Sequence, residues 1–133
     1  MKKIKLVLVA ICVLLFAACT PSKSNSPKDV VTTYLECIKS GNFEKAVNCF
    51  YFKEELQQTQ LKALAAKLEE GYNKEGGLTK FEIVSEDIEK DEDGNIIKGI
   101  VKVKMFYKDG KEEEETLNTV LNDGEWKIDF TIK

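Results

Sequence analysis

The spacing of apolar residues changes once along this chain, and that change divides it into a helical half and a strand half. Before Gly76-Gly77, apolar side chains recur every three or four residues, which is typical of amphipathic helices. After these glycines they alternate with polar residues, which is typical of strands with one buried face. The order predicts an α+β domain in which the helices pack on one face of an antiparallel sheet.

Three helices are expected in the first half. Ser26 stands in a capping position and Pro27 at the first helical position, so the first helix begins at Pro27 and stops at Ser40-Gly41-Asn42. A second, shorter helix carries a buried stripe from Phe43 to Phe50. The third covers about residues 53–70. The first two predict a helical hairpin.

Four strands are expected in the second half, because three Asp-Gly pairs, at residues 93–94, 109–110 and 123–124, mark tight hairpin turns. The second strand, Ile96 to Lys108, would reach about 43 Å at 3.3 Å per residue. A sheet of that length must curl to be covered by one layer of helices, and Gly99 is placed to supply a bulge or bend. The sequence therefore predicts a curved four-stranded meander that forms a cone with an open mouth.

The first 18 residues indicate a signal peptide. A basic start precedes the apolar run Leu6–Phe16, which is shorter than the ~20 residues that a membrane-spanning helix needs. Residues 15–19 resemble the bacterial lipobox, which implies cleavage between Ala18 and Cys19 and lipidation of Cys19. The alternatives are an ordinary secretory signal cut after Ala18, or a thiol with no role.

Cleavage after Ala18 would leave a polar tether over residues 19–26 and a single domain over residues 27–133. It would also remove three lysines and move the formal charge from −3 to −6. Such an acidic chain without a basic cluster is not expected to bind nucleic acid, so the membrane would be held through the lipid alone. Thr20, where inner-membrane lipoproteins carry Asp, implies by resemblance the outer membrane, facing the periplasm.

The composition excludes several kinds of site. All 20 basic residues are lysine and the chain has no histidine, so a Ser-His-Asp relay, a zinc site built on histidine and an arginine clamp cannot form. We expect no catalytic residue, no cofactor and no metal. Asp91–Asn95 hints at a calcium loop, but the pattern would place Ile100 at the last ligand, so an acidic turn is expected. Glu112–Glu115 is expected to be a solvated strand end, with a weak divalent-ion contact as the alternative.

The order of elements resembles the nuclear transport factor 2-like, cystatin-like α+β cone. The resemblance rests on a helix, the Ser40-Gly41-Asn42 turn, a short helix ending in Phe50-Tyr51-Phe52, a long helix and a meander closing on Trp126-Lys127-Ile128. Together with the lipobox, Ser26–Leu35 resembles small bacterial lipoproteins that carry such a domain of unknown function. The wider fold hosts isomerases, dehydratases and binding or dimerisation modules, so fold alone leaves function open.

Two sets of residues are candidates for function. Tyr34, Tyr107 and Trp126 are expected to contribute to an apolar pocket inside the cone. Cys37 and Cys49 lie on neighbouring helices in a compartment that permits disulfides, so they form either a disulfide or two buried, reduced thiols.

These observations favour a non-enzymatic, lipid-anchored envelope protein whose cone binds a small apolar ligand, a peptide or a protein partner. One alternative is an isomerase or hydrolase that uses tyrosines and carboxylates in the cone; a carboxylate with a raised pKa close to a tyrosine would support it. No base is evident, because Asp129 and Glu82 fall on the wrong faces of their strands. A second alternative is a structural or dimerisation module that pairs two copies as a homodimer.

Overall fold

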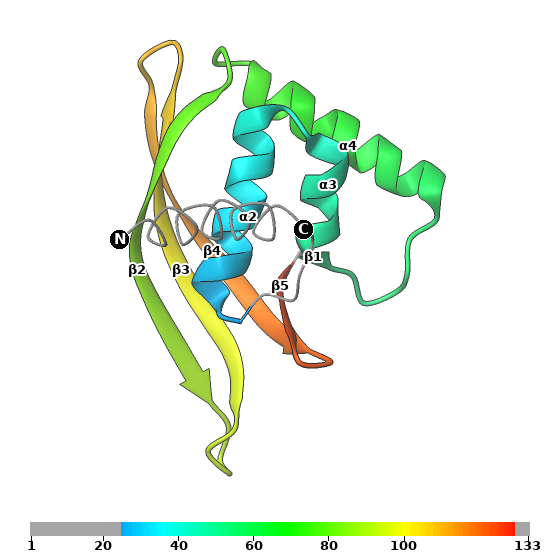
Figure 1. Cartoon of the computed structure of the whole chain (residues 1–133), viewed down its shortest axis with the longest axis vertical. Coiled ribbons are helices and arrows are strands. Elements are labelled where there is room, and N and C mark those ends of the chain that lie inside the picture. Colours follow the sequence, from blue (N-terminus) through cyan, green and yellow to red (C-terminus); the bar gives the residue numbers. More distant parts are fainter. Residues whose placement is uncertain (1–24, 130–133) are drawn as a thin grey trace, which may run out of the picture.

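The computed structural model describes residues 25–129, and Figure 1 shows their arrangement. The elements are α2 (Pro27–Ser40), α3 (Phe43–Ala46), the 3-10 turn η1 (Val47–Cys49), β1 (Phe50–Tyr51), α4 (Gln58–Asn73), β2 (Leu78–Lys90), β3 (Ile96–Tyr107), β4 (Glu112–Asn122) and β5 (Glu125–Asp129). The expected signal peptide, the cleavage site, Cys19 and most of the tether lie outside the described residues. Within residues 25–129, no helix has the length and apolar character to cross a membrane.

The predicted α+β fold is confirmed: three helices gather on one side of a curved sheet, with α2 next to the strands (Figure 1). The sheet order is β1-β5-β4-β3-β2, so β2 to β5 form the expected antiparallel meander. One strand was not expected. Phe50 and Tyr51 form β1, which pairs in parallel with β5 through Phe50 opposite Ile128.

The second and third helices begin or end differently from the sequence expectation. The second helix ends at Ala46 and continues as η1, because the chain must turn before Phe50 to join the sheet edge. The third begins at Gln58, where Gln57 and Gln60 form a reciprocal capping box at the N-terminus of α4. The glutamines that interrupt the apolar pattern there are therefore the helix start signal.

Helix α2 is fixed at both ends by hydrogen bonds. The Ser26 hydroxyl accepts a 3.1 Å bond from the backbone N–H of Asp29, and Pro27 occupies the first turn as predicted. At the other end Gly41 adopts φ 82°, and the N–H of Asn42 donates to the carbonyl of Cys37 at 2.8 Å. The helix is thus confined to Pro27–Ser40.

A bulge in β2 brings a third capping group to α2 from a distant part of the chain, the carboxylate of Glu86. Ile83 pairs with Val103 but Ser85 pairs with Lys102, so Val84 has no partner of its own and is 51% exposed. Because of the extra residue, the side chains of β2 after Val84 exchange faces relative to the alternation before it. Glu86 therefore faces the helices. The Glu86 carboxylate accepts a 2.8 Å bond from the backbone N–H of Lys28, in the first turn of α2.

Gly99 does not form the bulge or bend that the sequence led us to expect, so that expectation is wrong. β3 passes through Gly99 in continuous register, with Ile88 on one side and Thr119 on the other. The extra residues of the β2–β3 ladder are Thr79 and Val84 on β2 and Ile97 on β3. Gly99 instead lets the ring of Pro27 pack on the strand, since a Cβ there would lie 2.2 Å from Pro27 Cγ. Thr119 Oγ1 donates to the Gly99 carbonyl at 3.0 Å beside this contact.

The core forms between one stripe of α2 and one face of β3. As expected for a strand with one buried face, Val101 and Val103 of β3 are buried while Lys102 between them is exposed. The side chains of α2 that face this strand are equally buried. The least exposed apolar members are Val31, Leu35, Ala46, Val101, Val103 and Met105.

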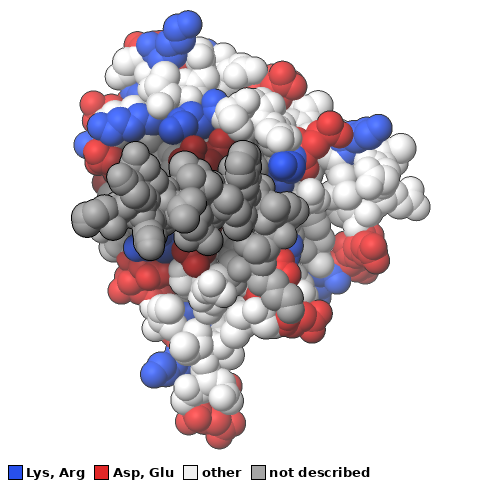
Figure 2. Space-filling model, in the orientation of Figure 1, with Lys and Arg blue, Asp and Glu red and all other residues white. Residues whose placement is uncertain are grey.

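The β2–β3 hairpin projects past the helices and ends in an acidic turn (Figures 1 and 2). The Asp91 carboxylate accepts 2.9 Å bonds from the backbone N–H groups of Asp93 and Asn95, and these bonds lower its pKa. Its oxygens therefore hold the turn together, which confirms the acidic-turn interpretation of Asp91–Asn95.

The contact between Gly99 and Pro27 predicts the effect of adding one methyl group. Gly99→Ala should lower the free energy of unfolding by about 1–3 kcal/mol, because the Pro27 ring and Thr119 must move. Urea denaturation measures the change. Gly71→Ala is the matched control: a Cβ at Gly71 in α4 meets nothing within 4 Å, so this variant should be unchanged or up to about 1 kcal/mol more stable. Equal stability of Gly99→Ala and wild type would contradict the account of this contact.

Candidate functional site

The pleat of β4 divides four consecutive glutamates between the two faces of the sheet. Glu113 and Glu115 pair in register with Met105 and Val103, whose side chains are buried against the helices. Because directly paired residues share a face, these two glutamates lie on the inner side of the sheet. All four glutamates are exposed at this strand end, but only this inner pair faces the cone.

The outer pair is neutralised by lysines of β3. Lys104 Nζ lies 3.2 Å from Glu112 Oε1, and Lys102 Nζ lies 3.8 Å from Glu114 Oε1. In the part of the chain that the structure describes, neither Glu113 nor Glu115 forms an ion pair. The inner pair therefore lacks the lysine partners that the outer pair has among the described residues.

A cavity of about 220 Å³ opens beside the inner glutamates, and we call it the tyrosine–glutamate pocket. The C-terminal half of α4 forms one wall, and the ends of β3 and β4 form the other. Its lining residues are Lys67, Leu68, Gly71, Tyr72, Glu75, Tyr107, Glu113 and Glu115.

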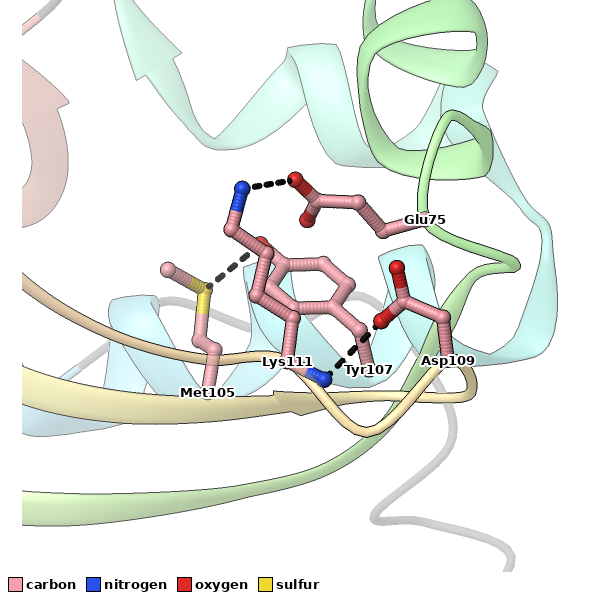
Figure 3. Close-up of polar contacts among 5 residues, drawn as sticks. All are labelled: Glu75, Met105, Tyr107, Asp109 and Lys111. Carbon is pink, nitrogen blue, oxygen red and sulfur yellow. Dashed lines mark hydrogen bonds and ion pairs between the residues drawn. The ribbon is translucent and has the colours of Figure 1, made fainter.

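Tyr72 and Tyr107 line this pocket, and Tyr34, which does not line it, contacts Tyr72. The hydroxyls of Tyr34 on α2 and Tyr72 on α4 are 3.1 Å apart and share a hydrogen bond. The rings of Tyr72 and Tyr107 are stacked, with centroids 6.3 Å apart. Figure 3 shows the Tyr107 hydroxyl turned toward Met105, to whose Sδ it donates at 3.8 Å. Burial raises the pKa of all three tyrosines above the ordinary value, so their hydroxyls stay protonated at neutral pH.

The carboxyl group of Glu115, which lines the pocket, has a shifted pKa. Its side chain as a whole is exposed, but partial desolvation of the carboxyl group raises its pKa. The like charge of Glu113 adds to the shift. The pocket therefore makes the negative charge of Glu115 unfavourable in the absence of a cation.

Two turns bound to each other form the rim of the pocket. Lys111 Nζ lies 2.7 Å from Glu75 Oε1, and the backbone N–H of Lys111 donates to Asp109 Oδ1 at 2.9 Å (Figure 3). The backbone N–H of Asp109 also donates to the carbonyl of Glu75. Gly76, at φ +87°, allows this approach, because a Cβ there would lie 3.0 Å from Lys108 Cβ. The α4–β2 and β3–β4 turns therefore hold one another in place.

The structure brings two of the three expected pocket residues together. Tyr34 and Tyr107 both contact Tyr72, through its hydroxyl and its ring respectively. Trp126 is 5% exposed, lies in the core and does not line the tyrosine–glutamate pocket. From the sequence, Glu112–Glu115 was expected to be one solvated strand end, so the inward position of Glu113 and Glu115 was not anticipated.

Both cysteines of the described region are free thiols. Cys49 is buried, and burial raises its pKa to about 11, while half-buried Cys37 also has a raised pKa. A disulfide between them stays a prediction. Among residues 25–129, no group of three His, Cys, Asp or Glu side chains is placed to hold a metal ion.

Two larger hollows lie elsewhere on the surface. One, of about 440 Å³, lies between α3 and α4, and the other, of about 410 Å³, lies beside β1 and includes Phe50, Phe52 and Leu61. Neither is lined by an inward-facing glutamate of β4. The tyrosine–glutamate pocket is therefore the better candidate for a chemically selective site.

Comparisons with known proteins identify the family and the fold. A family model described as "Domain of unknown function (DUF4878)" matches residues 19–129. A Campylobacter jejuni protein, provisionally described as an NTF2-like transpeptidase, superposes with a TM-score of 0.59, at 12% identity, over 79% of this chain and 98% of that one. Aln2 from a Streptomyces species has a TM-score of 0.47 at 13% identity, over 74% of this chain and 79% of its own. No curated protein matches the chain.

The pKa of Glu115 predicts that this residue lowers stability at neutral pH. Glu115→Gln should raise the urea midpoint at pH 7, because it removes a charge that the fold disfavours. A carboxyl group whose pKa is raised in the folded state is protonated in both states below the unfolded pKa, so the gain should vanish near pH 4. The gain should stay below about 1 kcal/mol, because the side chain is exposed.

Glu114→Gln on the outer face is the control for this experiment. Glu114 forms an ion pair with Lys102, so its replacement should leave the midpoint unchanged or slightly lower. If both variants raise the midpoint equally at pH 7, the effect comes from net charge, and the account of Glu115 is wrong.

Proposed function

Since the chain belongs to the DUF4878 family of domains of unknown function, we propose that it is a lipid-anchored envelope lipoprotein whose cone binds a small ligand in the tyrosine–glutamate pocket. The proposal rests on the pocket itself, where stacked tyrosine rings lie beside Glu113 and Glu115, which form no ion pair with another described residue. Ligand sites commonly combine apolar walls with a few polar groups that fix orientation.

The residues of the cone support binding over acyl transfer, the activity class attributed provisionally to the Campylobacter jejuni protein. A transpeptidase needs a hydroxyl or thiol nucleophile that a base or a lowered pKa activates. The sequence contains no histidine, and burial raises the pKa of both Cys37 and Cys49. Neither thiol is therefore activated as a nucleophile at neutral pH.

A second candidate function, acid–base catalysis, is favoured by one observation. The carboxyl group of Glu115 has a raised pKa and lies close to tyrosines whose hydroxyls stay protonated, a combination that suits proton transfer next to a carbonyl. The exposed position of Glu115 argues against it, because water is not excluded from the carboxyl group. Deuterium exchange into small ketones, monitored by NMR, would reveal such activity.

The proposed anchor is supported by the first 19 residues: a basic start, an apolar run too short to span a membrane and small residues before Cys19. One acyl chain alone gives weak membrane binding, whereas two or more hold a protein stably. A homodimer remains the third proposal from the sequence, and the mass in solution distinguishes it from a monomer.

The pocket proposal predicts that a bulky side chain at Gly71 abolishes ligand binding. Gly71 lines the pocket, and a Cβ there meets nothing within 4 Å, so Gly71→Phe should fill the cavity without a backbone clash. Saturation-transfer NMR with a library of anionic, neutral and cationic fragments measures binding. Fragments should bind wild type and Ala63→Phe, a variant on an exposed position of the same helix, but not Gly71→Phe. Failure of every fragment, or binding that survives Gly71→Phe, would contradict the proposal.

The anchor proposal predicts that Cys19→Ala moves the full-length protein from the membrane fraction to the soluble fraction of the cell, because the acylated thiol is lost. Cys12→Ala, which removes a thiol inside the expected signal peptide, should leave the protein in the membrane fraction. Fractionation followed by immunoblotting measures both. Membrane residence of Cys19→Ala would point to another anchor.

A further inference from the structure

The tyrosine–glutamate pocket has a charge that its own residues do not balance. Glu75 at the rim is neutralised by Lys111 at 2.7 Å. Lys67 also lines the pocket, but no ion pair joins it to Glu113 or Glu115 in the described structure. The two inner glutamates are thus left without a cation inside a formed cavity.

The spacing of these glutamates suits one cation between them. Residues two apart on a strand lie about 7 Å apart on the same face, so a positive group midway would be attracted by both carboxylates. The attraction is strengthened where the site is partly desolvated, as it is at Glu115. A neutral ligand would leave the two charges uncompensated, and an anion would be repelled.

The aromatic wall favours an organic cation over a metal ion. Hard divalent cations take six or more oxygen ligands, whereas this pocket offers two unpaired carboxylates. The adjoining rings of Tyr72 and Tyr107 supply aromatic surface that attracts alkylammonium groups through their π electrons. Aromatic rings combined with carboxylates are thus better suited to an ammonium group that carries carbon substituents.

The size of the cavity limits the ligand further. Its volume of about 220 Å³ lies below the ~300–1,000 Å³ of sites that enclose drug-sized molecules. The pocket therefore fits a small ammonium ion, or the ammonium group of a larger molecule whose remainder stays outside.

We propose that the tyrosine–glutamate pocket selects organic ammonium ions, with Glu113 and Glu115 compensating the charge and the rings of Tyr72 and Tyr107 contacting the alkyl groups. This inference rests on the proposed function and names the ligand class of the same pocket.

Binding should also depend on pH. Protonation of Glu115 removes half of the compensating charge, and its raised pKa brings this loss nearer to neutrality than for an ordinary glutamate. The other titratable residues that line the pocket are Lys67, Tyr72, Glu75, Tyr107 and Glu113. Lys111 pairs with Glu75 at the rim, and the Tyr34 hydroxyl bonds to that of Tyr72. The tyrosines stay protonated because burial raises their pKa, so affinity should fall as the pH is lowered through the raised pKa of Glu115.

The test compares two probes that differ only in charge. Choline and 3,3-dimethylbutan-1-ol have nearly the same shape, but one carries a quaternary nitrogen where the other carries carbon. Titration calorimetry on the detergent-solubilised full-length chain should show choline binding at least about tenfold more tightly than the neutral alcohol, since removal of one charge-assisted contact commonly has that effect.

Two double variants of β4 distinguish the effect of the charges in the pocket from the effect of general surface charge. Glu113→Gln with Glu115→Gln should weaken choline binding by about tenfold or more. Glu112→Gln with Glu114→Gln makes the same charge change on the outer face and should leave binding within about twofold.

Three results would overturn the inference: equal affinity for the two probes, an equal loss in both double variants, or no binding of choline. If neutral fragments still bind wild type and fail to bind Gly71→Phe, the pocket binds ligands but the ammonium class is wrong. If no fragment of any charge binds, the proposed function fails together with the ligand class.

Discussion

The contact between the first turn of α2 and the middle of β3 is the constraint on which the rest of the structure depends. Pro27 lies directly on Gly99, and Ser26 and Glu86 cap the helix at the same point. With its start fixed, α2 lies between the sheet and the other helices (Figure 1). About two turns later it carries Tyr34, whose hydroxyl meets Tyr72 on α4. One close contact therefore positions Tyr34, which in turn holds the pocket-lining Tyr72, far from the contact itself.

The alternation of side chains along β4 places charged groups in the pocket and makes it a selective site. A strand must place successive side chains on opposite faces, so an unbroken run of four glutamates sends two charges to each side. Lysines of β3 neutralise the outer two, and a cavity with tyrosine rings receives the inner two. The raised pKa of Glu115 indicates that its negative charge is unfavourable at this position, as expected where stability is given up for binding.

Much of the fold could be predicted from the sequence, because short stretches of neighbouring residues determine its helices and turns. The change of period at Gly76-Gly77 and the three Asp-Gly turns are enough for the helices and the meander. The role of Gly99 could not be predicted correctly, because a glycine is needed there for the contact with Pro27, which lies 72 positions earlier in the chain. The bulge at Val84 and the parallel pairing of β1 likewise depend on distant partners. Tyr107, which lines the pocket, and Tyr34, which contacts Tyr72, could be predicted from the sequence. The inner glutamates could not, because their position depends on the register of β4 with β3.

The central claim is that Glu115 holds an uncompensated charge that an organic ammonium ion neutralises. Carboxyl ¹³C NMR of the glutamate-labelled protein, titrated with acid in the absence and presence of choline, measures this directly. The account predicts that the pKa of Glu115 is raised in the free protein and falls when choline binds, because a bound cation favours the charged carboxylate. A Glu115 pKa that is ordinary in the free protein, or that choline leaves unchanged, would contradict the account.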